Sequence, residues 1–157
     1  MRRKDREVTD RAEILDIMRR CDVCRLALND GEYPYLVPLN FGMTAEGERV
    51  TLFFHSAQAG KKAELMRADP RAAFEMDCRR QLRYSEEAGY CTMAYESVIG
   101  RGRLRILSEE EKPAALRALM AHYHPEKETY FNPAAIPGTL VYALDVEQLT
   151  AKRNPLK

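Results

Sequence analysis

The stretch 52–65 restricts the possible folds more than any other part of this sequence. An apolar run ends at His55 and Ser56, a loop of small residues follows, and Gly60, Lys61 and Lys62 open a helical pattern. A strand is therefore expected to pass into a helix here. Free backbone N–H groups, the helix dipole and two ammonium groups at that point suit a phosphate. From the residues alone, an ordinary solvated helix start explains the pattern equally well.

The pattern of apolar and polar residues, alternating in some stretches and helically spaced in others, divides the rest of the chain into short elements. Strands are predicted over 23–28, 35–41, 49–54, 71–76, 92–107 and 140–146, and helices over about 10–20, 60–68 and 108–124. Short turns at 29–31 and 45–48 join the first three strands, so an antiparallel meander is expected. The charged stretch 79–90 is expected to form a long exposed loop.

Proline and glycine positions refine this picture. Pro38 cannot donate to a ladder, so its strand is predicted to be interrupted or at an edge. Gly100 and Gly102 lie inside the longest strand and predict a bulge or bend. Because there is no βαβ rhythm and no repeat, residues 1–157 are expected to form one domain, mainly β in the α+β class. Its predicted architecture is a small antiparallel barrel of about six strands with peripheral helices.

Composition excludes several classes of partner. Lysine and arginine together number 25, against 24 aspartates and glutamates, so neither nucleic acid nor an anionic membrane is an expected partner. The N-terminus is charged and is followed by no apolar segment of the length of a signal peptide or membrane span. A cytoplasmic location is therefore expected.

The cysteines and histidines do not predict a metal site. Cys21 and Cys24 have the C-x-x-C spacing, but Cys78 and Cys91 form no second pair of this kind. Reduced thiols are the expected state, and a zinc module built on the first pair stays as an alternative. The three histidines lack metal-ligand spacing, and no acidic residue lies near His55 in sequence to orient it.

Three segments together resemble a known family. Residues 33–41, residues 53–56 with Gly60-Lys61-Lys62, and residues 95–102 are similar to the pyridoxamine 5′-phosphate oxidase-related FMN-binding flavoproteins. Within that family the chain most resembles the nitroimidazole-reductase-like (Nim-type) branch. The resemblance runs from the N-terminus to about residue 107, and more loosely to the basic tail.

This resemblance implies a split β-barrel that forms a homodimer and binds FMN at the dimer interface. His55 would be the catalytic residue beside the flavin ring, and Tyr95 and Ser97 would complete the pocket from the partner chain. The implied cofactor-binding residues are Val37, Pro38, Leu39 and Asn40 at the ring, His55, Ser56, Gly60, Lys61 and Lys62 at the turn, Tyr95 and Ser97, and Lys152 and Arg153 near the phosphate.

The implied function is an FMN-dependent oxidoreductase that passes electrons to a small organic acceptor such as a nitroaromatic or a quinone. NAD(P)H is a candidate electron donor. The chain has no Trp and lacks the full set of residues that recognise pyridoxamine phosphate, so oxidation of vitamin B6 is not expected. The alternative is a non-catalytic protein on the same fold that binds or senses a flavin or haem.

Overall fold

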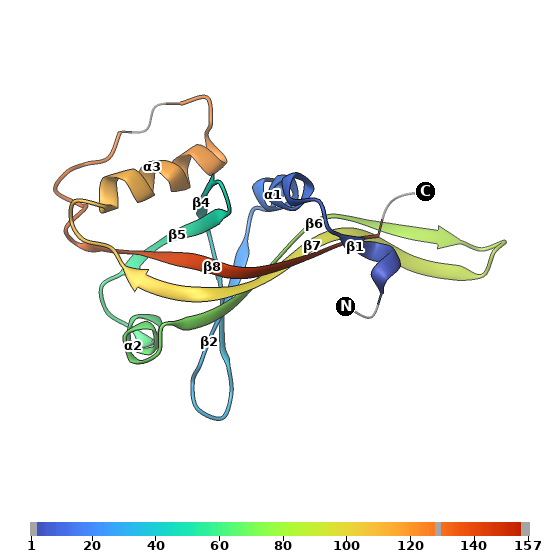
Figure 1. Cartoon of the computed structure of the whole chain (residues 1–157), viewed down its shortest axis with the longest axis horizontal. Coiled ribbons are helices and arrows are strands. Elements are labelled where there is room, and N and C mark those ends of the chain that lie inside the picture. The colour runs from blue at the N-terminus through green and yellow to red at the C-terminus, as the bar shows by residue number, and fades with distance from the viewer. Residues whose placement is uncertain (1–2, 128–129, 155–157) are drawn as a thin grey trace.

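One antiparallel sheet runs through the whole molecule (Figure 1). The computed structural model describes residues 3–127 and 130–154. Its strands are β1 (Glu7–Val8), β2 (Cys24–Leu28), β3 (Tyr35–Leu39), β4 (Gly42–Glu46), β5 (Arg49–Ala57), β6 (Arg71–Ser85), β7 (Tyr90–Ile106) and β8 (Thr139–Asn154). Its α-helices are α1 (Arg11–Arg20), α2 (Lys61–Ala68) and α3 (Lys112–Tyr123).

The sheet curls into a barrel that stays split. Its strand order is β3-β2-β6-β7-β8-β5-β4, with β1 added to β8, and within the described residues the two end strands β3 and β4 do not pair. Apolar side chains from the inner face fill the barrel, including Leu26, Phe54, Phe74 and Tyr142. The prediction of a mainly β split barrel with peripheral helices is therefore confirmed.

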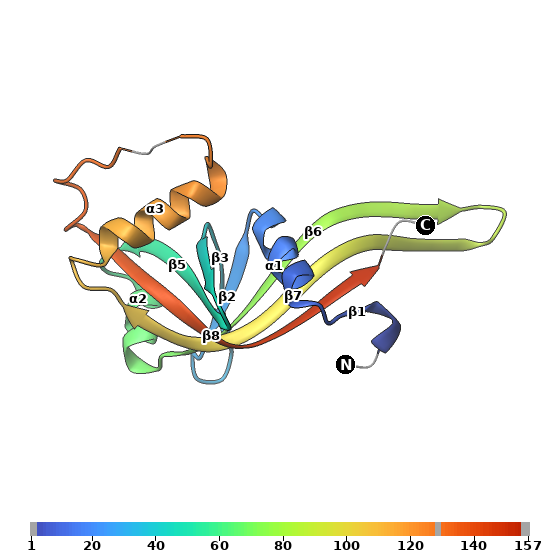
Figure 2. The same cartoon turned by 45° about the horizontal axis from the view of Figure 1, so that its top comes forward.

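A second, smaller core lies on the opposite face of β5 and β8. There α3 packs over Val141 and Ala143, with Leu107 and Leu116 completing the cluster. In Figure 2, α3 lies across this end of the sheet. A Cβ at Gly42 would lie 2.3 Å from the Leu119 backbone nitrogen, so β4 and α3 meet backbone to backbone.

The predicted boundaries of the first two helices agree with the observed ones, whereas α3 begins at Lys112, later than the predicted start at 108. Asp10 caps α1 by accepting a hydrogen bond from the Glu13 backbone N–H at 3.0 Å. Before α3, the Glu111 carboxylate accepts from the Ser108 backbone N–H at 2.9 Å, which is one of the two bonds of the predicted capping box. In the part of the chain that the structure describes, none of the helices combines the length and apolarity needed to cross a membrane.

The predicted three-strand meander is wrong. β2 pairs with β3 and β4 pairs with β5, but β5 then pairs with β8, from Thr51 opposite Asp145 to Ala57 opposite Thr139. The segment predicted as one strand over 35–41 is interrupted after Leu39, and the chain passes from one edge strand of the sheet, β3, to the other, β4. The Phe41 backbone N–H donates to the Tyr123 hydroxyl at 3.0 Å, which holds this crossing against α3. Pro38 does lie in an edge strand, as predicted.

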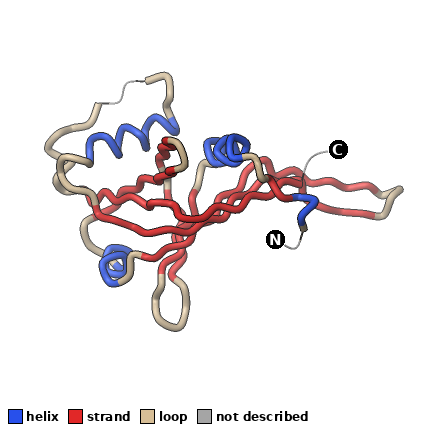
Figure 3. Tube along the Cα trace, in the orientation of Figure 1, coloured by secondary structure: helices blue, strands red, loops and turns tan. Residues whose placement is uncertain are grey.

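The predicted loop over 79–90 is also wrong. β6 and β7 continue as a two-stranded arm, paired from Gln81 opposite Ala94 to Ser85 opposite Tyr90, and only 86–89 form the turn. Figure 3 shows the arm projecting from the end of the sheet opposite α2 and α3. Both faces of the arm are largely exposed, so its sequence lacks the alternation that marks a half-buried strand.

The predicted bulge at the paired glycines is confirmed. The β7–β8 register shifts between Arg101 and Gly102, and Glu147 of β8 is the extra residue. A Cβ at Gly102 would lie 2.0 Å from the Asp145 carbonyl oxygen. The bulge therefore brings the two backbones too close for any side chain at this position.

We expect Gly102→Ala to lower the free energy of unfolding by at least about 2 kcal/mol, because the new methyl group must push two central strands apart. Urea unfolding followed by circular dichroism measures the change. Gly138→Ala is the matched control, since a Cβ there would meet its nearest atom at 3.7 Å, and it should leave stability nearly unchanged. Equal midpoints for the two variants would contradict the expectation.

Candidate functional site

The helix start predicted as a phosphate site is present and uncapped. Gly60 is the N-cap of α2 with φ of 121°, a conformation that favours glycine. In the described residues, no side chain bonds to the N–H groups of the first turn as a cap. These N–H groups and the positive end of the helix dipole are therefore available to an anion.

The two lysines of this turn differ in their surroundings. Lys61 is exposed, and its Nζ lies 2.5 Å from an Asp30 carboxylate oxygen in the β2–β3 loop and 5.8 Å from the centre of the Tyr35 ring. Lys62 is half-buried, with its Nζ 5.9 Å from the centre of the Tyr142 ring, and it has no ion-pair partner in residues 3–127 and 130–154. Burial lowers the pKa of Lys62. A negative charge bound beside Lys62 would offset this cost.

Beneath Lys62 lies a buried hydroxyl without a partner. Tyr142 is fully buried and stacks on Phe54 with the ring centroids 5.4 Å apart. Its hydroxyl has no hydrogen-bond partner in the described part of the chain, and the neighbouring Ser56 hydroxyl donates to the Ala57 carbonyl oxygen at 3.0 Å instead. Burial raises the pKa of Tyr142, so the hydroxyl remains a donor at neutral pH. An unsatisfied buried hydroxyl costs about 1–3 kcal/mol, which a polar ligand atom would recover.

Strand β3 lies next to this turn, as the contact between Lys61 and Tyr35 shows. Of the predicted ring-lining residues, Val37 and Leu39 are half-buried and pack on the barrel core, whereas Pro38 and Asn40 are exposed. Because β3 is an edge strand, no strand of the described residues is hydrogen-bonded to one side of its backbone. The structure therefore brings the beginning of β3 and the α2 turn together.

His55 lies on the other face of β5. It pairs with Val141, which packs under α3, whereas Ser56 shares the face of Phe54. Its imidazole lines a cavity beneath α3 and has no hydrogen-bond partner among residues 3–127 and 130–154. The His55 side chain is exposed, but the protein on one side of it partly desolvates the ring, and this, with the charge of Lys62 second, lowers the pKa of His55. The ring is therefore neutral at pH 7 and able to donate or accept one hydrogen bond.

The remaining predicted residues lie at the far end of the same chain. Ser97 pairs with Lys152, and β8 runs from there to Tyr142, a path of roughly 30 Å at about 3.3 Å per residue. Tyr95 lies beyond Ser97, opposite Asn154. Figure 1 shows this end of β8 near the arm and α2 at the other end of the molecule. Within one chain these residues cannot share a ligand with Lys61 and Lys62, so their predicted role requires a second copy.

Arg153 already has acidic partners. Its guanidinium donates to the buried Glu96 at 2.7 Å and to Glu13 at 3.0 Å, and Arg20 also donates to Glu96. Burial by itself would raise the pKa of Glu96, but the bonds from Arg20 and Arg153 outweigh it and lower the pKa. This cluster joins α1, β7 and β8 at the base of the arm.

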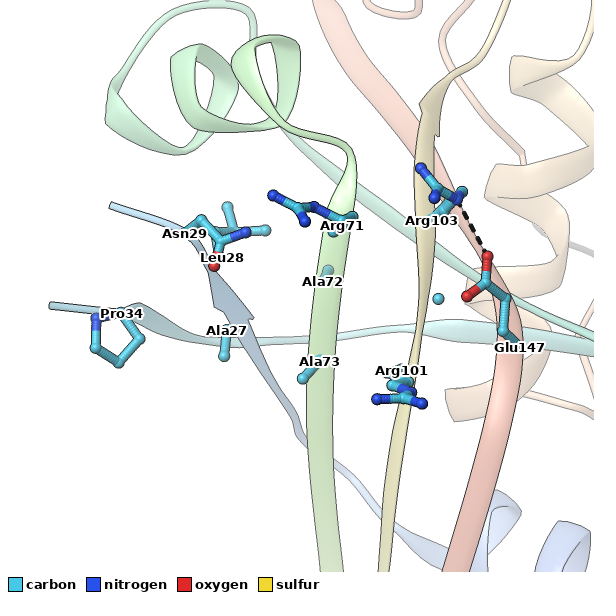
Figure 4. A pocket seen from close by; sticks show the side chains of 11 residues that line it. Ala27, Leu28, Asn29, Pro34, Arg71, Ala72, Ala73, Arg101, Arg103 and Glu147 are labelled. Carbon is cyan, nitrogen blue, oxygen red and sulfur yellow. Dashed lines mark ion pairs between the residues drawn. The ribbon is translucent and has the colours of Figure 1, made fainter. Parts of the chain in front are cut away.

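A shallow hollow lies on the outer face of the sheet (Figure 4). It measures about 470 Å³, and small residues such as Ala27, Ala73 and Gly102 form its floor. Arg103 pairs with Glu147 at 3.2 Å, as the dashed line in Figure 4 marks. The nearby Arg101 has no partner in the described chain. This face is therefore shallowly concave and partly basic.

Sequence reasoning missed several residues of the site. The sequence indicates Tyr142 only as one of the alternating positions of its strand, and Asp30 only as part of a turn. The signal for Tyr142 was its hydroxyl, because a buried tyrosine normally finds a hydrogen-bond partner. The partners of Lys61 and Lys62 come from segments far away in the sequence, so spacing could not show them.

A family model described as pyridoxamine 5′-phosphate oxidase matches residues 10–153. The chain belongs to this family. Among solved structures, a candidate 5-nitroimidazole antibiotic resistance protein from Bacteroides thetaiotaomicron is 29% identical with a TM-score of 0.80, over 93% of this chain and 85% of that one. The resemblance to the Nim-type branch of the pyridoxamine 5′-phosphate oxidase-related family is therefore confirmed.

Two more distant members of this structural group share the fold. The FAD and haem binding protein from Mycobacterium smegmatis has a TM-score of 0.82 at 17% identity, over 96% of this chain and 74% of that one. A flavocytochrome from Azotobacter vinelandii has a TM-score of 0.80 at 19% identity, over 99% and 72%. No curated protein matches the sequence.

We expect the His55 imidazole to titrate below pH 6.5 in an NMR titration of its ring protons. Since the unfolded chain binds this proton more readily, the free energy of unfolding falls as the pH decreases below 6.5, whereas above that pH His55 is neutral in both states. Lys62→Gln should raise the midpoint, because it removes the nearby positive charge. Lys61→Gln is the control, since that ammonium group is held at Asp30. A wild-type midpoint at or above 6.5 would refute this assignment.

Proposed function

We propose that the chain binds a flavin, specifically FMN, and acts as an oxidoreductase that passes electrons to a small organic acceptor such as a nitroaromatic or a quinone. The observation that carries the proposal is the half-buried, unpaired Lys62 above the unsatisfied Tyr142 hydroxyl, at an uncapped helix start. Membership of the family and the flavin-binding relatives support it.

The residues of this turn fit the phosphate of FMN. A phosphomonoester carries between one and two negative charges at pH 7 and has three acceptor oxygens. Lys61 and Lys62 supply two positive charges, and the first turn of α2 supplies N–H donors. The Tyr142 hydroxyl is a further candidate donor on the same face of the sheet as Ser56, and the Ser56 hydroxyl would become one by giving up its bond to the Ala57 carbonyl oxygen.

The flavin supplies the redox chemistry when it is bound. Val37, Pro38, Leu39 and Asn40 would form an apolar slot with free backbone groups beside the ring. The neutral His55 would donate a hydrogen bond to the acceptor from its own face of β5. NAD(P)H is the proposed donor of electrons.

We also propose that two copies form a homodimer through the outer face of β2, β3, β6 and β7. Leu36 and Ile99 on this face are 61% and 55% exposed and offer apolar surface to a second copy. Such a dimer would allow Tyr95, Ser97, Lys152 and Arg153 of one copy to reach the flavin of the other.

A cytoplasmic location is part of the proposal and is supported by the four cysteines, which are all free thiols.

A non-catalytic flavin- or haem-binding protein is the second candidate. The unpartnered His55 imidazole favours it, because neutral histidine is a common haem ligand. Addition of NAD(P)H with a panel of nitroaromatics and quinones separates the two. Steady turnover supports the oxidoreductase, whereas a bound flavin or a haem absorption band without turnover supports the binding protein.

We expect the double variant Lys61→Ala, Lys62→Ala to bind FMN roughly 100-fold more weakly, because two charge-assisted contacts to the phosphate are lost. Riboflavin, which lacks the phosphate, should bind the variant and the wild type with similar affinity. Quenching of flavin fluorescence measures both. Lys127→Ala, an exposed lysine outside the turn, is the control. An equal loss of affinity for FMN and for riboflavin would contradict the assignment of this turn to the phosphate.

We expect Ile99→Glu to convert a dimer into a monomer and to lower FMN occupancy, since it places a charge on the proposed interface. Analytical ultracentrifugation and the flavin absorbance of the purified protein measure the two effects. Tyr130→Glu is the control, because Tyr130 is also exposed but lies in the α3–β8 connection. A wild-type protein that is monomeric at micromolar concentration would rule out the dimer.

A further inference from the structure

Two of the free thiols are neighbours at the C-terminal end of α1. Cys21 follows the last turn of that helix as its C-cap, and Cys78 belongs to β6. The Cys21 Sγ lies 3.2 Å and the Cys78 Sγ 4.0 Å from the same atom, the Ile17 carbonyl oxygen. A hydrogen bond between the two thiols also changes the pKa of each. The fold therefore pairs two cysteines that are far apart in the sequence.

This pair differs from the C-x-x-C pair of the sequence. Cys24 is fully buried in the barrel core, where its thiol acts on the pKa of Tyr142. Cys21, at the other end of the motif, precedes β2 and donates to a carbonyl oxygen of α1. Cys91 is exposed on the arm, opposite Tyr84. Cys78 is therefore the cysteine best placed to react with Cys21.

Cys78 is the member of the pair that a small reagent can reach. Its side chain is half-buried and lines a solvent-open hollow of about 540 Å³, whereas Cys21 is fully buried. The Cys78 sulfur lies 3.8 Å from a carboxylate oxygen of Glu96, on the α1 side of the sheet. Ile99 is an odd number of positions from Glu96 and points to the opposite, outer face. A dimer formed through that outer face would leave Cys78 accessible.

The groups around Cys78 give the two thiols different chemistry. Burial raises the pKa of Cys78, but a hydrogen bond from Cys21 and the charge of Arg20, whose guanidinium donates to the sulfur at 3.6 Å, act against this effect. Glu96 opposes ionisation and Arg79 favours it. Burial also raises the pKa of Cys21, and there the Cys78 sulfur adds to the effect. A thiolate therefore forms at Cys78 before Cys21, and its fraction grows as the pH rises.

We propose that Cys78 and Cys21 form an oxidisable thiol pair, which a hydroperoxide such as hydrogen peroxide converts into a disulfide. The Cys78 thiolate attacks one peroxide oxygen and becomes a sulfenic acid, while the other oxygen leaves as hydroxide and takes up the proton that the thiol released. The Cys21 sulfur then bonds to the Cys78 sulfur and the sulfenic oxygen leaves as water. Two thiols and one peroxide thus give one disulfide and two waters, and both electrons come from the sulfur atoms.

The disulfide would tie α1 to the base of the arm. In Figure 2, α1 lies against β6 and β7 where these strands leave the barrel. In the reduced protein, Arg20 of α1 and Glu96 of β7 form an ion pair at this place. A bond between Cys21 and Cys78 would join α1 to β6 beside that ion pair. Oxidation would therefore add a covalent link to a contact that now depends on charge.

The test uses the Cys91→Ser variant, which lacks the exposed arm thiol, and needs neither FMN nor an electron acceptor. The reduced protein is treated with hydrogen peroxide at about pH 8, where more thiolate is present, and the remaining thiols are alkylated. Trypsin, which cuts after arginine, then releases residues 21–25 and 72–79 as separate peptides. We expect mass spectrometry to show these two peptides joined by a disulfide, and dithiothreitol to separate them.

Cys21→Ala and Cys24→Ala in the same background are matched variants, because both cysteines are fully buried and belong to peptide 21–25. Cys24→Ala should keep the cross-link. Cys21→Ala should lose it and leave a sulfenic acid on Cys78 that dimedone traps, whereas Cys78→Ala should give neither product. Fragmentation of the joined peptides identifies the linked sulfur without any change in the core. Absence of the cross-link, or a cross-link that maps to Cys24, would overturn the proposal.

Discussion

The pairing of β5 with β8 is the constraint on which the rest of the structure depends. It joins residues separated by most of the chain and fixes which side chains of β5 face the barrel and which face α3. Since neighbouring residues of a strand point to opposite faces, it sends Ser56 toward Tyr142 and His55 toward the cavity. One ladder thus supports a polar turn on one side and an apolar pocket on the other.

The turn between β5 and α2 concentrates groups that are costly without a ligand. Lys62 is half-buried without a counter-charge in the described residues, and the Tyr142 hydroxyl beneath it lacks a partner there. Lys61, in contrast, is held by Asp30 and contributes charge without strain. Unfavourable burial of polar groups is tolerated where function gains from it, because the bound ligand recovers the lost interactions.

Much of the fold could be predicted from the sequence, because the relevant signals are local. Asp10 before α1, Pro38 in an edge strand and the glycines beside the β7–β8 bulge each act through their own backbone. The prediction of a three-strand meander was wrong because the choice of β8 as the partner of β5 depends on packing across the barrel. The arm was not predicted because a two-stranded ribbon that is exposed on both faces has no alternation of apolar and polar residues. For the candidate site, spacing predicted an anion-binding turn at Gly60, Lys61 and Lys62, but it did not point to Tyr142 or Asp30, which only the fold brings near.

The arm formed by the ends of β6 and β7 has a consequence for how the molecule opens. Beyond Gln81 it pairs only with itself, whereas its base is clamped by the buried Glu96 between Arg20 and Arg153. Local opening costs little where few apolar contacts are buried. In a single chain, amide hydrogens of the arm therefore exchange with solvent far sooner than those of the barrel. The boundary between fast and slow exchange falls at Glu96.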